Sequence, residues 1–126
     1  MYGKVKKIDF YTNKTIKEYQ DAQRASMING DSVPRILNQC RRRGGVQNPQ
    51  QDYYYRFVED EPTPHSYIAV YDLDFDLVGK YFSIQDAEEK TGVMRYSIGK
   101  QLQNKLPLKE RKSPTSGLYF IREEVN

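Results

Sequence analysis

The stretch from Ser83 to Leu102, SIQDAEEKTGVMRYSIGKQL, decides how the rest of the chain is interpreted. Ser83 can accept a hydrogen bond from a backbone N–H of a first helical turn, and Asp86 suits the positive end of that helix dipole. Gly92 can take the left-handed conformation that closes a helix. Apolar residues recur at about helical spacing on both sides of this glycine: Ile84, Ala87, Val93, Ile98 and Leu102. The stretch therefore predicts two short helices around a tight turn, the outline of a helix-turn-helix.

A weaker copy of this pattern lies upstream. Placing Asp21 on Asp86, an offset of 65, also aligns Ser32 with Ser97 and Arg35 with Lys100. The same offset aligns four further pairs, Ile28 with Val93, Val33 with Ile98, Leu37 with Leu102 and Tyr54 with Tyr119. Before the helices the offset falls to 62, which predicts that the first copy lacks the equivalents of residues 82–84 and so lacks the Ser83 cap. The repeat therefore predicts a unit of about 60 residues that occurs twice.

Strand and turn signals complete each unit. Paired strands are predicted within residues 4–19 and 67–82, and the aromatic segments 53–58 and 117–121 predict a closing strand for each copy. Asp31 or Ser32 is expected to cap the second helix of the first copy. The fold class is α+β: two pseudo-repeated units, each a three-stranded antiparallel sheet with a helix-turn-helix-like pair packed on it, with a core that both units share.

The predicted domains are a first, degenerate repeat over 1–60, an acidic proline-containing linker over 61–66 and a second repeat over 67–126. His65, within the linker, is expected to be exposed and without a role. Cys40 is expected to be a small buried apolar residue, because a lone cysteine can form no intramolecular disulfide.

The 126-residue chain carries a net charge of +3, and its cations gather in two places. Arg35 and residues 41–43 form one basic stretch, and residues 95–112 form another that only Glu110 interrupts. Acidic residues collect elsewhere, over 59–61 and at 72, 74 and 76, which indicates a polarised surface suited to a polyanion such as nucleic acid. Two solvated loops are the alternative interpretation. No apolar run approaches the ~20 residues of a membrane span and the N-terminus does not resemble a signal peptide, so a soluble, cytoplasmic protein without a membrane partner is expected.

The second copy resembles the small modular DNA-binding repeats found beside the catalytic domains of phage and intron-encoded homing endonucleases. The matching segments are Val70-Tyr71-Asp72-Leu73, Ser83-Ile84-Gln85-Asp86-Ala87, Gly92-Val93, Ser97-Ile98, Leu102 with Lys105, and Gly117-Leu118-Tyr119-Phe120. They cover nearly all of residues 68–121. The chain departs from the pattern at Phe75-Asp76, where family members usually have Asn-Gly, in a longer loop after the second helix, and in lacking a tryptophan near Tyr119.

The resemblance implies a helix-turn-helix-like module whose second helix enters a DNA groove, here in a tandem pair without a nuclease domain, encoded by a phage or a mobile element. Carried over position by position, it points to Arg95, Tyr96, Ser97 and Lys100, and through the internal repeat to Ser32 and Arg35. The residues themselves agree in part, because Ile98 and Leu102 must face inward and leave Arg95, Tyr96 and Lys100 facing outward. For Ser32 and Ser97 the alternative role is helix capping, and for Tyr96 it is packing.

Arginine can read guanine through two hydrogen bonds, whereas the lysines of the helix and the loop more readily contact phosphate. The candidate nucleic-acid-binding residues are Arg35, Gln39, Arg41, Arg42, Arg43, Arg95, Tyr96, Ser97, Lys100, Lys105, Lys109, Arg111 and Lys112.

The sequence offers no catalytic or metal site. A single histidine argues against an HNH-type nuclease centre and against a nucleophile activated by histidine. The series Asp72, Asp74 and Asp76 resembles the start of a calcium loop, but Leu77 stands where that loop needs glycine and Ser83 where it needs glutamate. A non-enzymatic protein without cofactors is therefore expected.

Two functions from different classes are compatible with these observations. The first is double-stranded DNA binding through the second helix of each repeat and the basic loops after it. The second is inhibition of a host nuclease or nucleoprotein by a phage-type, anti-CRISPR-like protein. The small size, the acidic hairpin and the missing catalytic domain favour this second function. The sequence leaves the oligomeric state open.

Overall fold

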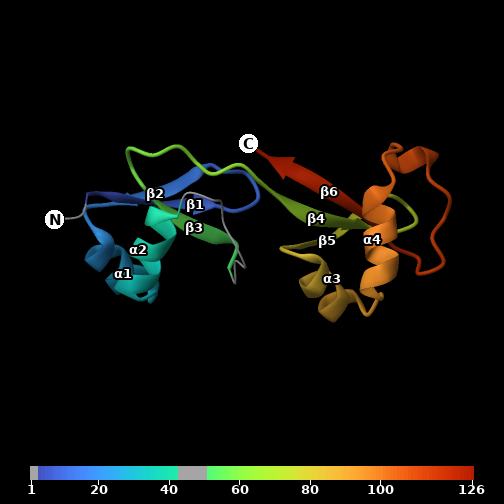
Figure 1. The fold of residues 1–126 in the computed structure, drawn as a ribbon, viewed down its shortest axis with the longest axis horizontal. Helices are drawn as coiled ribbons and strands as arrows, with labels where there is room; N and C mark the ends of the chain where they lie inside the picture. Colours follow the sequence, from blue (N-terminus) through green and yellow to red (C-terminus); the bar gives the residue numbers. More distant parts are fainter. Residues whose placement is uncertain (1–2, 43–50) are drawn as a thin grey trace. The chain divides into compact units, whose positions relative to one another are not determined.

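The structure, a computed structural model, describes residues 3–42 and 51–126. The chain divides into two compact units, one ending at His65 and the other spanning Ser66–Glu124, and Val125 and Asn126 belong with the first. Each unit contains two strands, two helices and a closing strand in chain order (Figure 1). The prediction of an α+β fold with two similar units is confirmed.

In the first unit, strands β1 (Val5–Asp9), β2 (Thr15–Tyr19) and β3 (Tyr53–Phe57) form a sheet in the order β2-β1-β3. Strand β1 pairs antiparallel with both neighbours. The turn between β1 and β2 is held by Asp9, whose Oδ1 accepts hydrogen bonds from the backbone N–H groups of Tyr11 and Thr12. Helices α1 (Ala22–Asn29) and α2 (Val33–Arg41) pack on one face of this sheet.

The second unit repeats this arrangement with β4 (His65–Tyr71), β5 (Leu77–Tyr81) and β6 (Tyr119–Val125) in the order β5-β4-β6. Asp72 holds its hairpin turn by accepting from the N–H groups of Asp74 and Asp76, which gives these aspartates a structural role in the turn. Helices α3 (Ile84–Thr91) and α4 (Arg95–Gln103) follow, and a short 3₁₀ helix, η1 (Leu108–Glu110), interrupts the predicted loop before β6.

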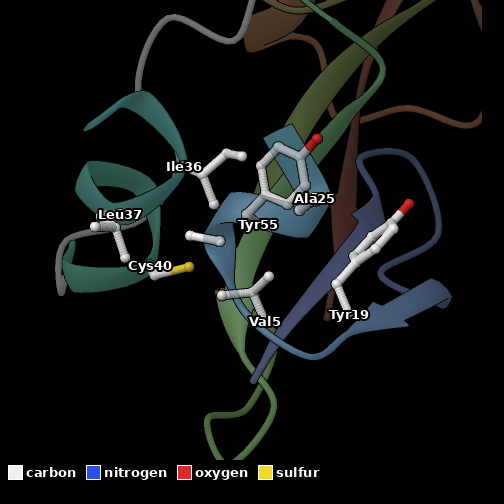
Figure 2. Close-up of a cluster of buried hydrophobic side chains, with 8 residues drawn as sticks. Val5, Tyr19, Ala25, Ile36, Leu37, Cys40 and Tyr55 are labelled. Atoms are coloured by element: carbon white, nitrogen blue, oxygen red, sulfur yellow. The ribbon is translucent and has the colours of Figure 1, made fainter. Parts of the chain in front are cut away.

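Each unit has its own cluster of buried apolar side chains between its helices and its sheet. In the first unit, Ile36 and Cys40 of α2 turn toward Val5 and Tyr55 of the sheet (Figure 2). The cluster of the second unit consists of Ile68, Val70, Ala87, Ile98, Leu102 and Phe120. Cys40 is 2% exposed, as the sequence predicted.

The helices of the two units correspond at an offset of 62, and the predicted offset of 65 is wrong there. Asp21 caps α1 by accepting from the N–H of Arg24, as Ser83 caps α3 by accepting from that of Asp86. Gly30 closes α1 with a φ of 79°, as Gly92 closes α3 with a φ of 77°. The inward residues match as well: Ala25 with Ala87 and Ile36 with Ile98, all 0% exposed. The first unit therefore has a cap at the position of Ser83, and the prediction that it lacks one is wrong; it also has a glycine at the position of Gly92.

The closing strands correspond at an offset of 65. The backbone N–H of Tyr55 donates to Oε1 of Gln39 (3.0 Å), and that of Phe120 donates to Oε1 of Gln101 (3.1 Å). Because Gln39 and Gln101 are 62 residues apart while Tyr55 and Phe120 are 65 apart, the three additional residues of the second unit lie between α4 and β6.

The segment predicted to be a linker is held against the first unit. Thr63 donates its backbone N–H to the Tyr54 hydroxyl (3.1 Å) and accepts from Nδ2 of Asn13 (3.2 Å). The His65 ring lies 4.2 Å from that of Phe10, and its two nitrogens lie within hydrogen-bonding distance of the carbonyl oxygens of Thr63 and Phe10. The prediction that His65 is exposed and without a role is therefore wrong.

Candidate nucleic-acid interface

A reciprocal cap fixes the start of α3 and so the position of the helix pair in the second unit. Ser83 accepts from the backbone N–H of Asp86 (3.1 Å), and Oδ2 of Asp86 accepts from that of Phe82 (3.2 Å). At the other end, the Thr91 hydroxyl donates to the Ala87 carbonyl (2.7 Å) and accepts from the N–H of Val93 (3.2 Å). These bonds hold the turn from which α4 starts.

Helix α4 is capped by a side chain from α3. Its N-cap residue, Met94, offers no side-chain hydrogen bond, but Oε2 of Glu88 accepts from the backbone N–H of Arg95 (2.7 Å). Oε1 of Glu88 accepts from Nε (3.3 Å) and Nη2 (3.2 Å) of the same arginine. The backbone N–H of Arg95 and then its guanidinium lower the pKa of the Glu88 carboxyl below its usual range. The carboxylate thus binds the start of α4 and the Arg95 side chain together.

The outward face of α4 carries the residues that the sequence placed there. Tyr96 is 68% exposed, and Nζ of Lys100 lies 4.9 Å from the centre of its ring, at cation–π distance. Ile98 and Leu102 face the core, so the predicted division of the helix into an inner and an outer face is confirmed. Ser97 is exposed in the first turn of α4 and is not its cap, whereas Ser32 caps α2 by accepting from the N–H of Arg35.

The basic loop after α4 contains two kinds of cation. Lys105, Lys109 and Lys112 are exposed. Arg111 is half-buried and donates to four carbonyl oxygens, those of Leu106 (3.0 Å), Gln101 (3.2 Å), Phe120 (3.2 Å) and Asn104 (2.6 Å). Burial lowers the pKa of its guanidinium. Arg111 therefore joins the end of α4 to the loop and to β6. These hydrogen bonds give it a structural role, which differs from the predicted contact with nucleic acid.

In the first unit, the candidate residues are placed differently. Arg35 is half-buried beside Asp31, with Nη2 3.5 Å from Oε1 of Gln51, and Gln39 joins α2 to β3. Arg41 and Arg42 are exposed at the end of α2, and Arg43 lies outside the described residues. At the offset of 62, Arg35 corresponds to Ser97 rather than to Lys100, whose counterpart is Asn38.

Sequence reasoning missed a buried polar cluster in the first unit. The Asp31 carboxylate, 6% exposed, accepts hydrogen bonds from the hydroxyls of Tyr53 (2.7 Å) and Tyr55 (2.6 Å) and from Nε2 of Gln51 (3.2 Å). Burial alone would raise the pKa of Asp31, but these hydrogen bonds and the charge of Arg35 outweigh it and hold that pKa below 3.8. Burial and the carboxylate raise the pKa of Tyr53 to about 12 and that of Tyr55 as well.

The equivalent place in the second unit is apolar. Val93 stands at the position of Asp31, and Leu118 and Phe120 stand at the positions of Tyr53 and Tyr55. The second unit thus has three apolar side chains where the first has a carboxylate and two tyrosine hydroxyls. Residues two apart in a strand lie on the same face, so the spacing of Tyr53 and Tyr55 could have suggested that their hydroxyls share a hydrogen-bond acceptor.

Comparisons with protein-family models, curated proteins and solved structures found no match. Within the described part of the chain, no three His, Cys, Asp or Glu side chains come together as a group that could hold a metal ion. Over residues 3–42 and 51–126, no helix is long and apolar enough to cross a membrane.

Proposed function

We propose that the protein is a non-enzymatic double-stranded DNA-binding protein that lays the outward face of α4 against the duplex. The observation that carries the proposal is the composition of this face: Arg95, Tyr96 and Lys100 are all exposed on a helix whose opposite side is fixed to a core by Ile98 and Leu102. An arginine can read a base edge, a lysine can neutralise a phosphate, and both chemistries are offered by a helix of the size that fits a major groove.

The loop after α4 extends this surface. Lys105, Lys109 and Lys112 are exposed within a stretch that Arg111 holds to the end of α4 through backbone carbonyls. Phosphate contacts from such lysines add affinity without sequence preference. Arg111 supports the binding surface by fixing the loop and does not itself contact DNA.

The first unit contributes less to DNA binding. Its helix α2 has Pro34 and Asn38 where α4 has Tyr96 and Lys100, so the outward pair of aromatic ring and cation is missing. The exposed Arg41 and Arg42 at the end of α2 remain as phosphate contacts. The second unit therefore supplies the groove helix.

Replacing Lys100 by the residue at the matched position of α2, Asn38, tests this assignment. Lys100→Asn gives α4 the residue of α2, and is expected to weaken binding to a mixed-sequence duplex severalfold and to reduce the salt dependence by about one phosphate contact. Lys14→Asn, which removes another exposed lysine, from the hairpin turn of the first unit, is the charge-matched control and should change little. Fluorescence anisotropy over a salt series measures both quantities.

The same experiment can reject the proposal. Absence of duplex binding by the unaltered protein even at ~50 mM salt would end it, because electrostatic binding is strongest there. Equal effects of Lys100→Asn and Lys14→Asn would mean that net charge, and not the face of α4, drives the association.

A second candidate function is binding of a host nuclease or nucleoprotein, and one observation favours it. Met94 and Tyr96 are 71% and 68% exposed beside Arg95, and methionine, tyrosine and arginine are enriched in protein interfaces. A pull-down from nuclease-treated lysate distinguishes the candidates. A protein partner should survive the digestion and be lost with Tyr96→Ala, whereas a partner bridged by DNA should disappear on digestion.

A further inference from the structure

The contact between Glu88 and Arg95 leaves one edge of the arginine free. Nε and Nη2 of Arg95 both donate to Oε1 of Glu88, at 3.3 and 3.2 Å. A guanidinium has five N–H donors in one plane, so Nη1 and the second hydrogen of Nη2 remain along the adjacent, terminal edge. None of the described residues accepts from Nη1 of Arg95, and the side chain is 63% exposed. The free edge therefore faces solvent beside the outward face of α4.

Glu88 is itself fixed, so it can hold this edge in place. Its other oxygen, Oε2, accepts from the backbone N–H of Arg95 at 2.7 Å, and its side chain is only 32% exposed. One carboxylate thus joins the backbone and the side chain of the same residue. The backbone N–H and the guanidinium of Arg95 lower the pKa of this carboxyl, which favours its ionised form. An arginine held along one edge loses less rotamer freedom when its other edge meets a ligand.

We propose that Glu88 is a positioning residue that makes Arg95 the sequence-reading contact of the DNA surface, an inference that rests on the proposed function. The free edge of Arg95 presents two parallel donors, the pattern that meets the two acceptors of guanine in the major groove. The negative charge of Glu88 at the same time opposes binding to phosphate in general. Both effects increase the difference in affinity between a preferred sequence and other DNA.

The first unit has neither Glu88 nor Arg95 at the equivalent positions. Ser26 stands in place of Glu88 and Val33 in place of Arg95, so neither the carboxylate nor the guanidinium is present. In that unit the Ser32 side chain caps α2. A cap alone can thus be supplied by serine, and the ion pair of the second unit does more than capping requires.

The test compares two duplexes, one enriched from a random pool by the unaltered protein and one with the same bases shuffled. The variants are Glu88→Gln, which keeps an acceptor for the Arg95 N–H, and Glu89→Gln, which removes the same charge from the neighbouring, exposed position. Arg95→Lys keeps the charge of residue 95 but removes the planar fork, and serves as a second variant that leaves the Glu88 cap in place. Hydrogen exchange over residues 95–103 checks that α4 is intact in each.

The expected result is that Glu88→Gln and Arg95→Lys each lower the ratio of the two affinities by about tenfold. Glu88→Gln should also bind the shuffled duplex more tightly than the unaltered protein, and in an Arg95→Lys background it should no longer change the ratio. Glu89→Gln should leave the ratio as it is.

Other results would overturn the inference. A ratio unchanged by Glu88→Gln, or changed equally by Glu89→Gln, would leave Glu88 as a cap and a charge only. An unaltered protein that binds duplex DNA with strong salt dependence but enriches no sequence would refute the role of Glu88 while leaving the proposed function standing. A protein that binds no duplex at all would refute both.

Discussion

Replacing Asp31 by valine, the residue at the equivalent position 93, is expected to destabilise the first unit by about 2 kcal/mol. The Tyr55 hydroxyl, on a residue only 1% exposed, loses its charged acceptor and keeps only the Tyr53 hydroxyl as a partner, and the loss of such a buried hydrogen bond costs about 1–3 kcal/mol. The half-buried Tyr53 hydroxyl and Gln51 can turn to water, so they add about 1 kcal/mol together. Burial of the valine side chain returns about 1 kcal/mol.

Changing the partners as well should restore most of this stability. The triple variant Asp31→Val/Tyr53→Leu/Tyr55→Phe reproduces the apolar trio of Val93, Leu118 and Phe120 and is expected within about 1 kcal/mol of the unaltered unit. The double variant Tyr53→Leu/Tyr55→Phe keeps a buried carboxylate and removes its two shortest hydrogen bonds, which should cost about 3 kcal/mol. Two destabilising changes are thus expected to compensate when combined.

Native-state hydrogen exchange read on peptides from residues 3–42 is the suitable assay, because each unit has its own core and a single global transition cannot be assumed. Peptides from residues 66–124 serve as an internal control and should not change. An Asp31→Val variant as stable as the unaltered protein, or a triple variant no more stable than Asp31→Val alone, would refute this role of Asp31.

The same cluster gives the stability of the first unit an acid limit. Burial opposes ionisation of Asp31, but the hydrogen bonds from Tyr55, Tyr53 and Gln51 prevail and hold its folded-state pKa below the ordinary 3.8. A carboxyl whose pKa is lower in the folded state stabilises fully above the unfolded-state pKa, and that contribution is lost as the pH falls through the folded-state pKa. Exchange measured at decreasing pH should therefore show a loss of protection that is smaller in the triple variant.

Three further predictions concern single residues. Arg111→Gln leaves carbonyls at the end of α4 without a donor and should destabilise residues 104–120 by about 2 kcal/mol in hydrogen exchange, while the exposed neighbour Lys112→Gln should not. Gln39→Met removes the acceptor of the Tyr55 N–H and should cost about 1–2 kcal/mol without changing duplex affinity; weaker DNA binding at unchanged stability would make Gln39 a contact after all. Burial raises the pKa of Cys40 to about 12, so iodoacetamide at mildly alkaline pH should modify it slowly in the native protein and rapidly in urea; equal rates would contradict its burial.

The element order could be predicted because its signals are local. Ser32 and Ser83 cap α2 and α3, Gly92 closes α3, and aromatic and β-branched residues are frequent in the strands. The inward positions Ile98 and Leu102 follow from helical spacing alone, and so does the outward position of Lys100. The part of the candidate site that lies on α4 was therefore within reach of sequence reasoning.

The roles of Arg111 and Gln39 were not within reach, because tertiary packing decides them. An arginine between lysines in a basic loop looks like a phosphate contact, and only the fold brings the carbonyls of Gln101, Asn104 and Phe120 around it. A glutamine on the polar side of a helix likewise looks solvent-exposed until β3 lies beside it. Long-range backbone partners leave no trace in the residues next to them in sequence.

The offset between the helices of the two units was predicted as 65 and is 62, and this error has a physical cause. Serine and aspartate are both good helix caps, so the equivalent caps Asp21 and Ser83 are different residue types. Aligning Asp21 with the identical residue Asp86 therefore shifted the alignment by three residues, about one helical turn. At the correct offset Asp31 replaces a partly buried valine, and tyrosines on β3 supply the hydroxyls that make its burial tolerable. The carboxylate and the hydroxyls are favourable together, and either is costly without the other. The first unit therefore stabilises the same fold with a buried polar cluster where the second unit has apolar side chains, and its helix α2 lacks the outward Tyr96 and Lys100 of α4.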